Sequence, residues 1–250
     1  AFSFKKTKLK PWLKKMWCIQ KITPEFRKCM YDILDLYREP YDSRNPVLGV
    51  DEKPKQLIED SRKPIPMRPG KAEKYDYEYI RNGKANIFVA IEPRHGKRIT
   101  KVTERRTKKD FAKFMRELVL SYPHAEKLRV VLDNLNTHFE GSFYEAFDKG
   151  EADKILKKLE FHYTPKHASW LNVAEIEIGA IDKECTDRRI KDISYLRKEV
   201  KSCTKMRNDE RCKIDWRFTK EDADRKLAKH YVTLLICQTN SLAPNATKIL

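Results

Sequence analysis

The chain has 250 residues and a formal net charge of +17, from 54 Lys and Arg against 37 Asp and Glu. With 40% hydrophobic residues it can fold around a core, as one large domain or two small ones. It contains only 7 glycines and neither a GxGxxG nor a GxxxxGK[ST] motif, which excludes the common glycine-rich nucleotide-binding loops. A chain this basic is expected to bind a polyanion, most commonly nucleic acid; the alternative is a charge that serves solubility alone.

The six cysteines form no CxxC pair, and no histidine lies at zinc-finger spacing from any of them. They indicate reduced, mostly structural thiols of an intracellular protein. The apolar stretch Val232–Cys237 is too short to span a bilayer, and the N-terminus lacks the apolar centre of a signal peptide. We therefore expect a cytoplasmic protein that makes no membrane contact.

Residues 1–40 predict a basic linker arm followed by a helix over Glu25–Tyr37. The first 30 residues hold nine Lys and Arg against one acid, and Trp12 and Trp17 interrupt them. Such an arm suits a DNA backbone, or it is a linker that its tryptophans dock on the body. The lysines that we expect to bind DNA are Lys5, Lys6, Lys8, Lys10, Lys14 and Lys15.

Residues 41–232 predict one domain in which strands come first, then a strand alternating with helices, then helices. The strand candidates are the apolar runs Val47–Val50, Ile87–Ile91, Val130–Leu132 and Phe161–Tyr163, with Arg98–Glu104 as a hairpin partner. Residues 52–84 are polar and contain four prolines, which indicates a long loop or an irregular hairpin. This order predicts a mixed sheet with packed helices, α/β or α+β.

The helices of this domain are predicted from caps and apolar periodicity. A capping box at Thr107–Asp110 opens a helix whose apolar side chains repeat at helical spacing. Residues 142–158 are predicted as helical, and so is most of the chain from Asn172 onward, with breaks near 209–217. Residues 233–250 are expected to form an irregular tail.

The stretch VVLDNLNTH drives an apolar strand into a carboxylate, Asp133. Either the strand simply ends there in a loop, or Asp133 is a metal ligand mounted on the rigid edge of a sheet. Asn134, Asn136 and His138 follow, as candidates to orient water, DNA or Asp133, or as ordinary hydrogen-bonding loop residues.

A third acid follows in YTPKHASWLNVAEIEIGA, where Glu175 stands three residues after the predicted helix start Asn172. Taken alone, Asn-x-x-Glu resembles a capping box, so Glu175 could serve only its own helix. His167 and Trp170 in the preceding loop either contact DNA near the site or pack the loop. Arg188 and Arg189, further along, are expected to meet phosphate or solvent.

Asp51, Asp133 and Glu175 together suggest a metal site, because two predicted strands end in an acid and the third acid starts a helix. Magnesium prefers hard oxygen ligands, and two such ions roughly 4 Å apart can hold both reacting oxygens of a phosphodiester. Glu52 on the same strand would face away from Asp51. Glu177 would point about 200° away from Glu175 around the helix, so neither is expected to share the metal.

The blocks DEKPKQLIED, VVLDNLNTH and HASWLNVAE, taken in this order, resemble the three signature blocks of a DDE transposase. The likeness is to the bacterial insertion-sequence branch of the mariner-like superfamily and runs from about Lys10 to Tyr231. It implies a ribonuclease-H-like fold, with a central five-stranded mixed sheet flanked by helices. It also implies two magnesium ions, replaceable by manganese, held by Asp51, Asp133 and Glu175 as the catalytic residues.

The resemblance further implies double-stranded DNA as the partner, a homodimer in the synaptic complex, a TA target and a nucleoid-associated bacterial protein. Members usually begin with helix-turn-helix modules that read the terminal repeats; the chain shows none, so we expect little sequence preference from it. The 41 residues between Asp133 and Glu175 exceed the usual spacing, and segment 142–158 is expected to hold the extra length. The expected activity is cut-and-paste transposition; the alternatives are a transposase-derived DNA-binding protein without activity and a non-transposing nuclease of the same fold.

Overall fold

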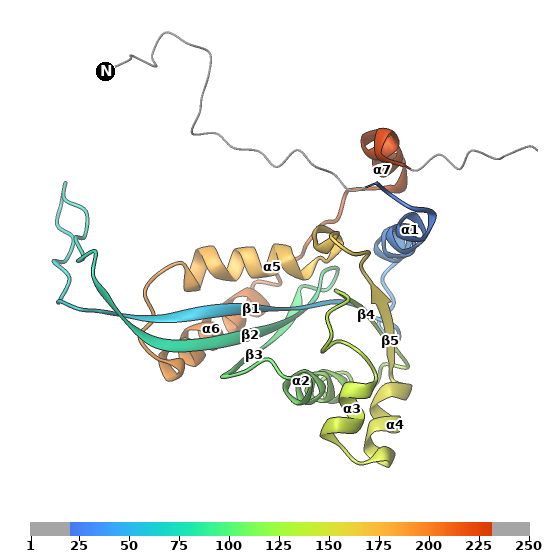
Figure 1. Ribbon diagram of the computed structural model, residues 1–250, viewed down its shortest axis with the longest axis horizontal. Coiled ribbons are helices and arrows are strands. Elements are labelled where there is room, and N and C mark those ends of the chain that lie inside the picture. Colours follow the sequence, from blue (N-terminus) through green and yellow to red (C-terminus); the bar gives the residue numbers. More distant parts are fainter. Residues whose placement is uncertain (1–20, 232–250) are drawn as a thin grey trace, which may run out of the picture.

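The structure is a computed structural model that describes residues 21–231. Its centre is a five-stranded mixed sheet in the order β3-β2-β1-β4-β5 (Figure 1). The strands are β1 (Val47–Asp60), β2 (Tyr79–Glu92), β3 (Lys97–Thr103), β4 (Leu128–Leu132) and β5 (Leu159–Tyr163). The first three pair antiparallel, whereas β4 pairs parallel with β1 and with β5. The predicted sheet of five strands with mixed directions is confirmed.

The prediction that the first strand ends at Asp51 is wrong. β1 continues nine residues further, because β2 stays paired with it from Gly49 opposite Ile91 to Asp60 opposite Tyr79. β4 pairs with β1 only as far as Gly49, so within the described residues no strand lies along that edge of the rest of β1, which tolerates Pro54. Of the two expectations for residues 52–84, the irregular hairpin is the one observed, and Figure 1 shows its ribbon projecting from the body.

One face of the sheet is covered by α2 (Lys108–Leu120), α3 (Gly141–Ala146) and α4 (Lys149–Lys157). The other face carries α1 (Pro24–Arg38), α5 (Ala174–Ile181), α6 (Ile193–Asp209) and α7 (Lys220–Leu227). Strand alternation divides the core, since Phe88 packs with the α2 side and Val89 with the α5 and α6 side. Buried apolar side chains on both faces hold the sheet between two helical layers (Figure 1).

Helix starts follow the local signals where a side chain caps them. Thr107 and Asp110 form the predicted capping box of α2. The predicted helix 142–158 is divided in two, because Asp148 caps α4 anew after α3 has ended. The predicted break after α6 is confirmed between Asp209 and the start of α7 at Lys220.

The start of α5 differs from the prediction. The helix begins at Ala174 rather than at Asn172, and it runs into a π-helical turn at Asp182–Thr186. The basic arm with its six lysines and the tail 233–250 lie outside the described residues. Among the described helices, none has the length and apolar character needed to cross a membrane.

Candidate active site

Asp51 and Asp133 follow the point where two neighbouring parallel strands, β1 and β4, stop pairing. The last pair between the two strands is Gly49 of β1 with Val131 of β4; Asp51 follows two residues later on β1, and Asp133 directly follows the end of β4 at Leu132. Asp51 is paired with Val89 and so lies on the face of the sheet that α5 and α6 cover, whereas Asp133 is in the loop that leaves β4. The sheet register therefore brings the first two predicted acids near each other.

Glu175 reaches this place because the first turn of α5 lies directly against β1. A Cβ on Gly49 would stand 2.4 Å from Val173 Cγ1 and 2.8 Å from the Ala174 backbone nitrogen, so only glycine permits this approach. The amide of Asn172 donates to Val50 O over 2.8 Å and reaches Asp51 Oδ2 at 3.3 Å. β1 and the start of α5 are thus joined beside Asp51.

The capping-box interpretation of Glu175 is wrong. Val173 occupies the cap position of α5 and makes no side-chain capping bond, and the Asn172 backbone N–H that Glu175 would have to accept donates to Ser169 O. The side-chain nitrogen of Asn172 is used on β1, while its Oδ1 accepts from Ala174 N at 3.1 Å. Glu175 is exposed on the first turn, and its charge is felt at Asp51. Its carboxylate is therefore free for a ligand beside Asp51.

The other two acids act on the protonation of Asp51. Burial raises the pKa of Asp51 to about 7, and the charges of Asp133, Glu175 and Glu52 add to the rise. A hydrogen bond from the Glu52 backbone N–H, 2.8 Å from Oδ1, acts in the opposite direction. Asp51 is a carboxylate that is costly to ionise until a positive charge compensates for its neighbours.

His138 connects Asp133 to a fourth acid. Its Nδ1 lies 2.6 Å from Asp133 Oδ1 and its Nε2 lies 2.9 Å from Glu52 Oε2. Burial lowers the pKa of His138, but the hydrogen bonds and charges of Asp133 and Glu52 outweigh burial and raise it to about 9. Of the two interpretations of His138, the contact with Asp133 is the one observed, and the imidazolium holds that carboxylate in place.

Glu52 was expected to face away from Asp51, and it does, toward α2. Its involvement was nevertheless missed: the side chain is 2% exposed, and its Oε1 has no hydrogen-bond partner among the described residues. Arg106 Nη1 stands 3.8 Å from that oxygen. The available signal was the Asp-Glu pair itself, because adjacent acids on a buried strand place one charge on each face of the sheet.

The remaining candidates are more peripheral. Asn134 and Asn136 are exposed and make no side-chain hydrogen bond within the described chain. In the loop before α5, His167 is exposed with φ 64°, and half-exposed Trp170 packs edge-on against Phe218.

The two arginines after α5 are engaged within the protein. Arg188 forms an ion pair with Glu199, and Arg189 pairs with Asp60 at 2.6 Å. Neither arginine is a free surface cation, although Arg188 remains about half exposed. Their expected contact with phosphate stays a prediction.

The donor chemistry of the three acids fits a hard divalent cation, since all their ligand atoms are carboxylate oxygens. As the side chains stand, no group of three His, Cys, Asp or Glu within residues 21–231 is close enough to ligate one ion. Asp133 is instead bonded to His138, and the three carboxylates repel each other without a cation. Assigning the metal to them is therefore a proposal.

Comparison with known families identifies the class of protein. The family described as DDE superfamily endonuclease matches residues 46–197, which is more than half of the chain and includes all three acids. The chain therefore belongs to the DDE superfamily endonucleases. No curated protein matches the sequence.

The solved structures show the same fold. The catalytic domain of the Mos1 mariner transposase has a TM-score of 0.53 at 12% identity, over 88% of this chain and 98% of that one. A pre-cleavage Mos1 transpososome has a TM-score of 0.57 at 13% identity, over 91% and 68%. The Mos1 paired-end complex with the left transposon end has a TM-score of 0.53 at 13% identity, over 81% of this chain and 61% of that one. The ribonuclease-H-like fold is thus confirmed, and the chain spans about 61% to 68% of the longer Mos1 chains.

Proposed function

We propose that the chain is the catalytic domain of a cut-and-paste DNA transposase of the mariner-like superfamily. It hydrolyses a phosphodiester at the transposon end and then joins the freed 3′-hydroxyl to target DNA. The observation that supports this proposal is the pairing of Gly49 with Val131, two residues before Asp51 and Asp133, together with the action of the Asp133 and Glu175 charges on Asp51. The family match and the fold of the Mos1 catalytic domain support it.

The three acids would hold two magnesium ions, for which manganese can substitute. When bound, the ions would activate the attacking water or hydroxyl and stabilise charge on the phosphate. The protein supplies orientation. The imidazolium of His138 donates from Nδ1 to Asp133, and the amide of Asn172 donates toward Asp51 Oδ2. These contacts limit the rotation of both aspartates, so that less ordering is left to the metal.

The partner would be double-stranded DNA, as transposon end and as target, and the active assembly a homodimer. The Mos1 structures named above, a paired-end complex with the left transposon end and a pre-cleavage transpososome, support DNA as the partner. The net charge of +17 is the feature of this chain that suits a polyanion.

Asp133→Asn tests the catalytic assignment. The amide oxygen can still accept from His138 Nδ1, but the charge that attracts a divalent cation is gone. Nicking of a supercoiled plasmid in magnesium or manganese should disappear, while the melting temperature stays within a few degrees of wild type. Both measurements are made on one preparation, with EDTA as the blank and Asp209→Asn, an exposed acid on α6, as the control.

Three outcomes separate the rival functions. Wild-type nicking by folded Asp133→Asn protein would refute the catalytic assignment. DNA binding without metal-dependent nicking by the wild type would indicate a transposase-derived binding protein. Nicking without joining of a pre-cut transposon end to target DNA would indicate a nuclease of the same fold.

DNA binding by this chain should be mainly electrostatic. Lys and Arg that neutralise phosphates release counterions, so the affinity should fall by a factor of roughly 10³ or more between 50 and 200 mM salt. Binding of labelled duplexes, measured by fluorescence anisotropy at several salt concentrations, should also vary little with sequence. A salt-insensitive complex, or strong preference for one sequence, would contradict this prediction.

A further inference from the structure

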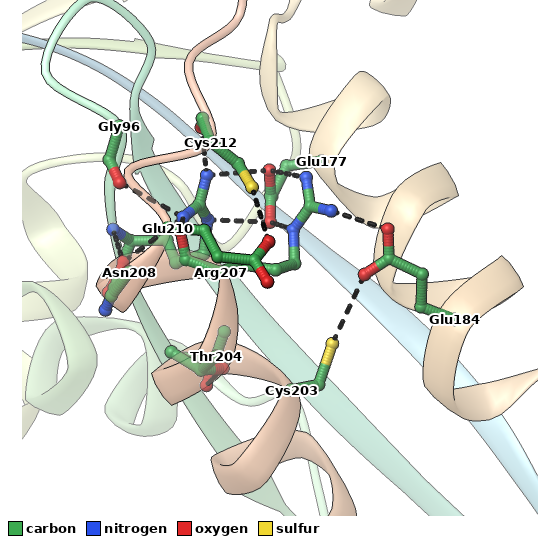
Figure 2. A network of polar contacts seen from close by, with 11 residues as sticks. Gly96, Glu177, Glu184, Cys203, Thr204, Arg207, Asn208, Glu210 and Cys212 are labelled. Atoms are coloured by element: carbon green, nitrogen blue, oxygen red, sulfur yellow. Dashed lines mark hydrogen bonds and ion pairs between the residues drawn. The ribbon is translucent and has the colours of Figure 1, made fainter.

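A buried network of ion pairs surrounds Glu177, two residues after the proposed ligand Glu175 (Figure 2). Glu177 Oε1 lies 2.8 Å from Arg98 Nε and 2.8 Å from Arg207 Nε, and its Oε2 accepts from Arg207 Nη2 at 3.1 Å. The side chains of Glu177 and Arg98 are both 0% exposed. Arg207 also reaches Glu184 Oε1 at 2.7 Å, where the network meets the surface.

The network joins three elements that are distant in sequence. Glu177 comes from α5, Arg98 from the edge strand β3 and Arg207 from α6. Arg98 is itself fixed, because it donates to the backbone carbonyls of Gly96, Arg207 and Cys212. These bonds fix the position of the guanidinium to which Glu177 of α5 is paired.

A contribution to stability does not by itself explain why these ion pairs are buried. Removing charges from water costs about as much as the pairing returns, and buried ion pairs can often be replaced by apolar side chains without loss. What apolar packing supplies poorly is direction. Directional contacts hold Glu177 from both sides: Arg207 donates to it from Nε at 2.8 Å and from Nη2 at 3.1 Å, and Arg98 donates from Nη2 at 3.4 Å. Together they restrict how far α5 can rotate about its axis.

The rotation of α5 decides where Glu175 points. Glu177 faces inward and Glu175 outward, about 200° apart around the helix. α5 has only eight residues and passes directly into a π-helical turn. The regular helix is therefore too short to fix its own orientation through packing along its length. The residue before the helix cap, Asn172, is attached to β1, and the end of the first turn is attached by Glu177. Two attachments define the direction of the side chain between them.

We propose that Arg98, Glu177 and Arg207 form a positioning network that sets the rotation of α5 and thereby aims Glu175 at Asp51 and Asp133. This inference rests on the proposed function, because it assumes that Glu175 is a metal ligand. Glu177 itself touches neither metal nor DNA. It acts only through the helix that it shares with Glu175.

Glu177→Asp is the informative variant, because it keeps the charge and shortens the side chain by one methylene. A network that only balances charge would accept this change, whereas one that sets a position would not. The Kd for Mn²⁺, measured from the free-ion paramagnetic resonance signal, should rise about tenfold. The magnesium concentration for half-maximal plasmid nicking should rise in parallel, and affinity for duplex DNA should not change.

Two further variants separate positioning from folding. Val200→Ala opens a cavity in the α6 core without touching the network, so it should lower the melting temperature and leave the Kd for Mn²⁺ unchanged. Arg207→Lys keeps the charge but removes the paired contact, so it should weaken Mn²⁺ binding as Glu177→Asp does. The double variant should be no weaker than either single one, since both act through one network.

The proposal is overturned if Glu177→Asp and Arg207→Lys bind Mn²⁺ as wild type does. It is also overturned if Val200→Ala, at a comparable melting temperature, loses as much affinity for Mn²⁺ as these two variants do. If wild-type protein itself neither binds Mn²⁺ nor nicks DNA, the proposed function has failed before the network is tested. The same assays therefore distinguish the two failures.

Discussion

Asp51→Asn is expected to stabilise the metal-free protein while abolishing nicking. The folded-state pKa of Asp51 is raised from 3.8 to about 7, so the folded protein holds this proton more tightly than the unfolded chain does. The resulting penalty is absent below about pH 4, grows as the pH rises and is complete above about pH 7. The penalty to the free energy of unfolding is at most about 4 kcal/mol.

Asparagine avoids this penalty, since it carries no charge at any pH. It keeps an oxygen to accept from the Glu52 backbone N–H but loses the bond from Asn172. The net gain in stability is therefore smaller than the full penalty that is removed. The melting temperature in EDTA at pH 8 should rise by about 5 °C, and the gain should shrink toward pH 4. Magnesium should stabilise the wild type and not the variant. A variant that melts below wild type at pH 8 in EDTA would contradict the penalty that burial and the neighbouring charges impose on Asp51.

Gly49→Ala is expected to damage both the fold and the activity. The new methyl group would stand 2.4 Å from Val173 Cγ1 and 2.8 Å from the backbone nitrogen of Ala174. The second contact is with backbone, so rotation of a side chain cannot relieve it, and the start of α5 must move away from β1. Overpacking of this kind costs about 1 to 3 kcal/mol, or roughly 5 °C in melting temperature.

The loss of nicking should exceed the loss of stability, because Glu175 moves with the start of α5. Gly179→Ala is the matched control in the same helix, where an added Cβ would meet nothing within 4 Å. Alanine there should raise stability by up to about 1 kcal/mol and leave nicking intact. If Gly49→Ala protein nicks like wild type at a temperature where it is folded, the close approach of α5 to β1 is not needed for the reaction.

Residue patterns predicted most elements because their causes are local. Apolar runs and the Thr107 capping box depend on near neighbours in the chain, and the observed strands and α2 follow them. The three acids were identified from their positions beside such runs, together with the resemblance of the blocks that contain them. The charges of Asp133 and Glu175 act on Asp51, but the three side chains as they stand do not form one ligand set, so the metal site stays a prediction.

Where local signals failed, a partner distant in sequence was responsible. β1 continues past Asp51 because β2 supplies hydrogen bonds as far as Asp60. Asn172 and Glu175 do not form a capping box, since the Asn172 backbone N–H donates to Ser169 O; the Asn172 side-chain nitrogen donates instead to Val50 on β1, 122 residues away in the chain. A capping pattern describes what a helix end can do by itself, and it holds no information about a neighbouring strand.

The sequence by itself determined the strand runs, the caps, the basic charge and the three acids, since each depends on residue type and short spacing. Only the tertiary structure decided what surrounds those acids. It places Glu52 against His138, 86 residues apart, and Glu177 against Arg98, 79 residues apart. Such pairs depend on how strands and helices pack, because a buried charge can be kept only where the fold brings a partner to it.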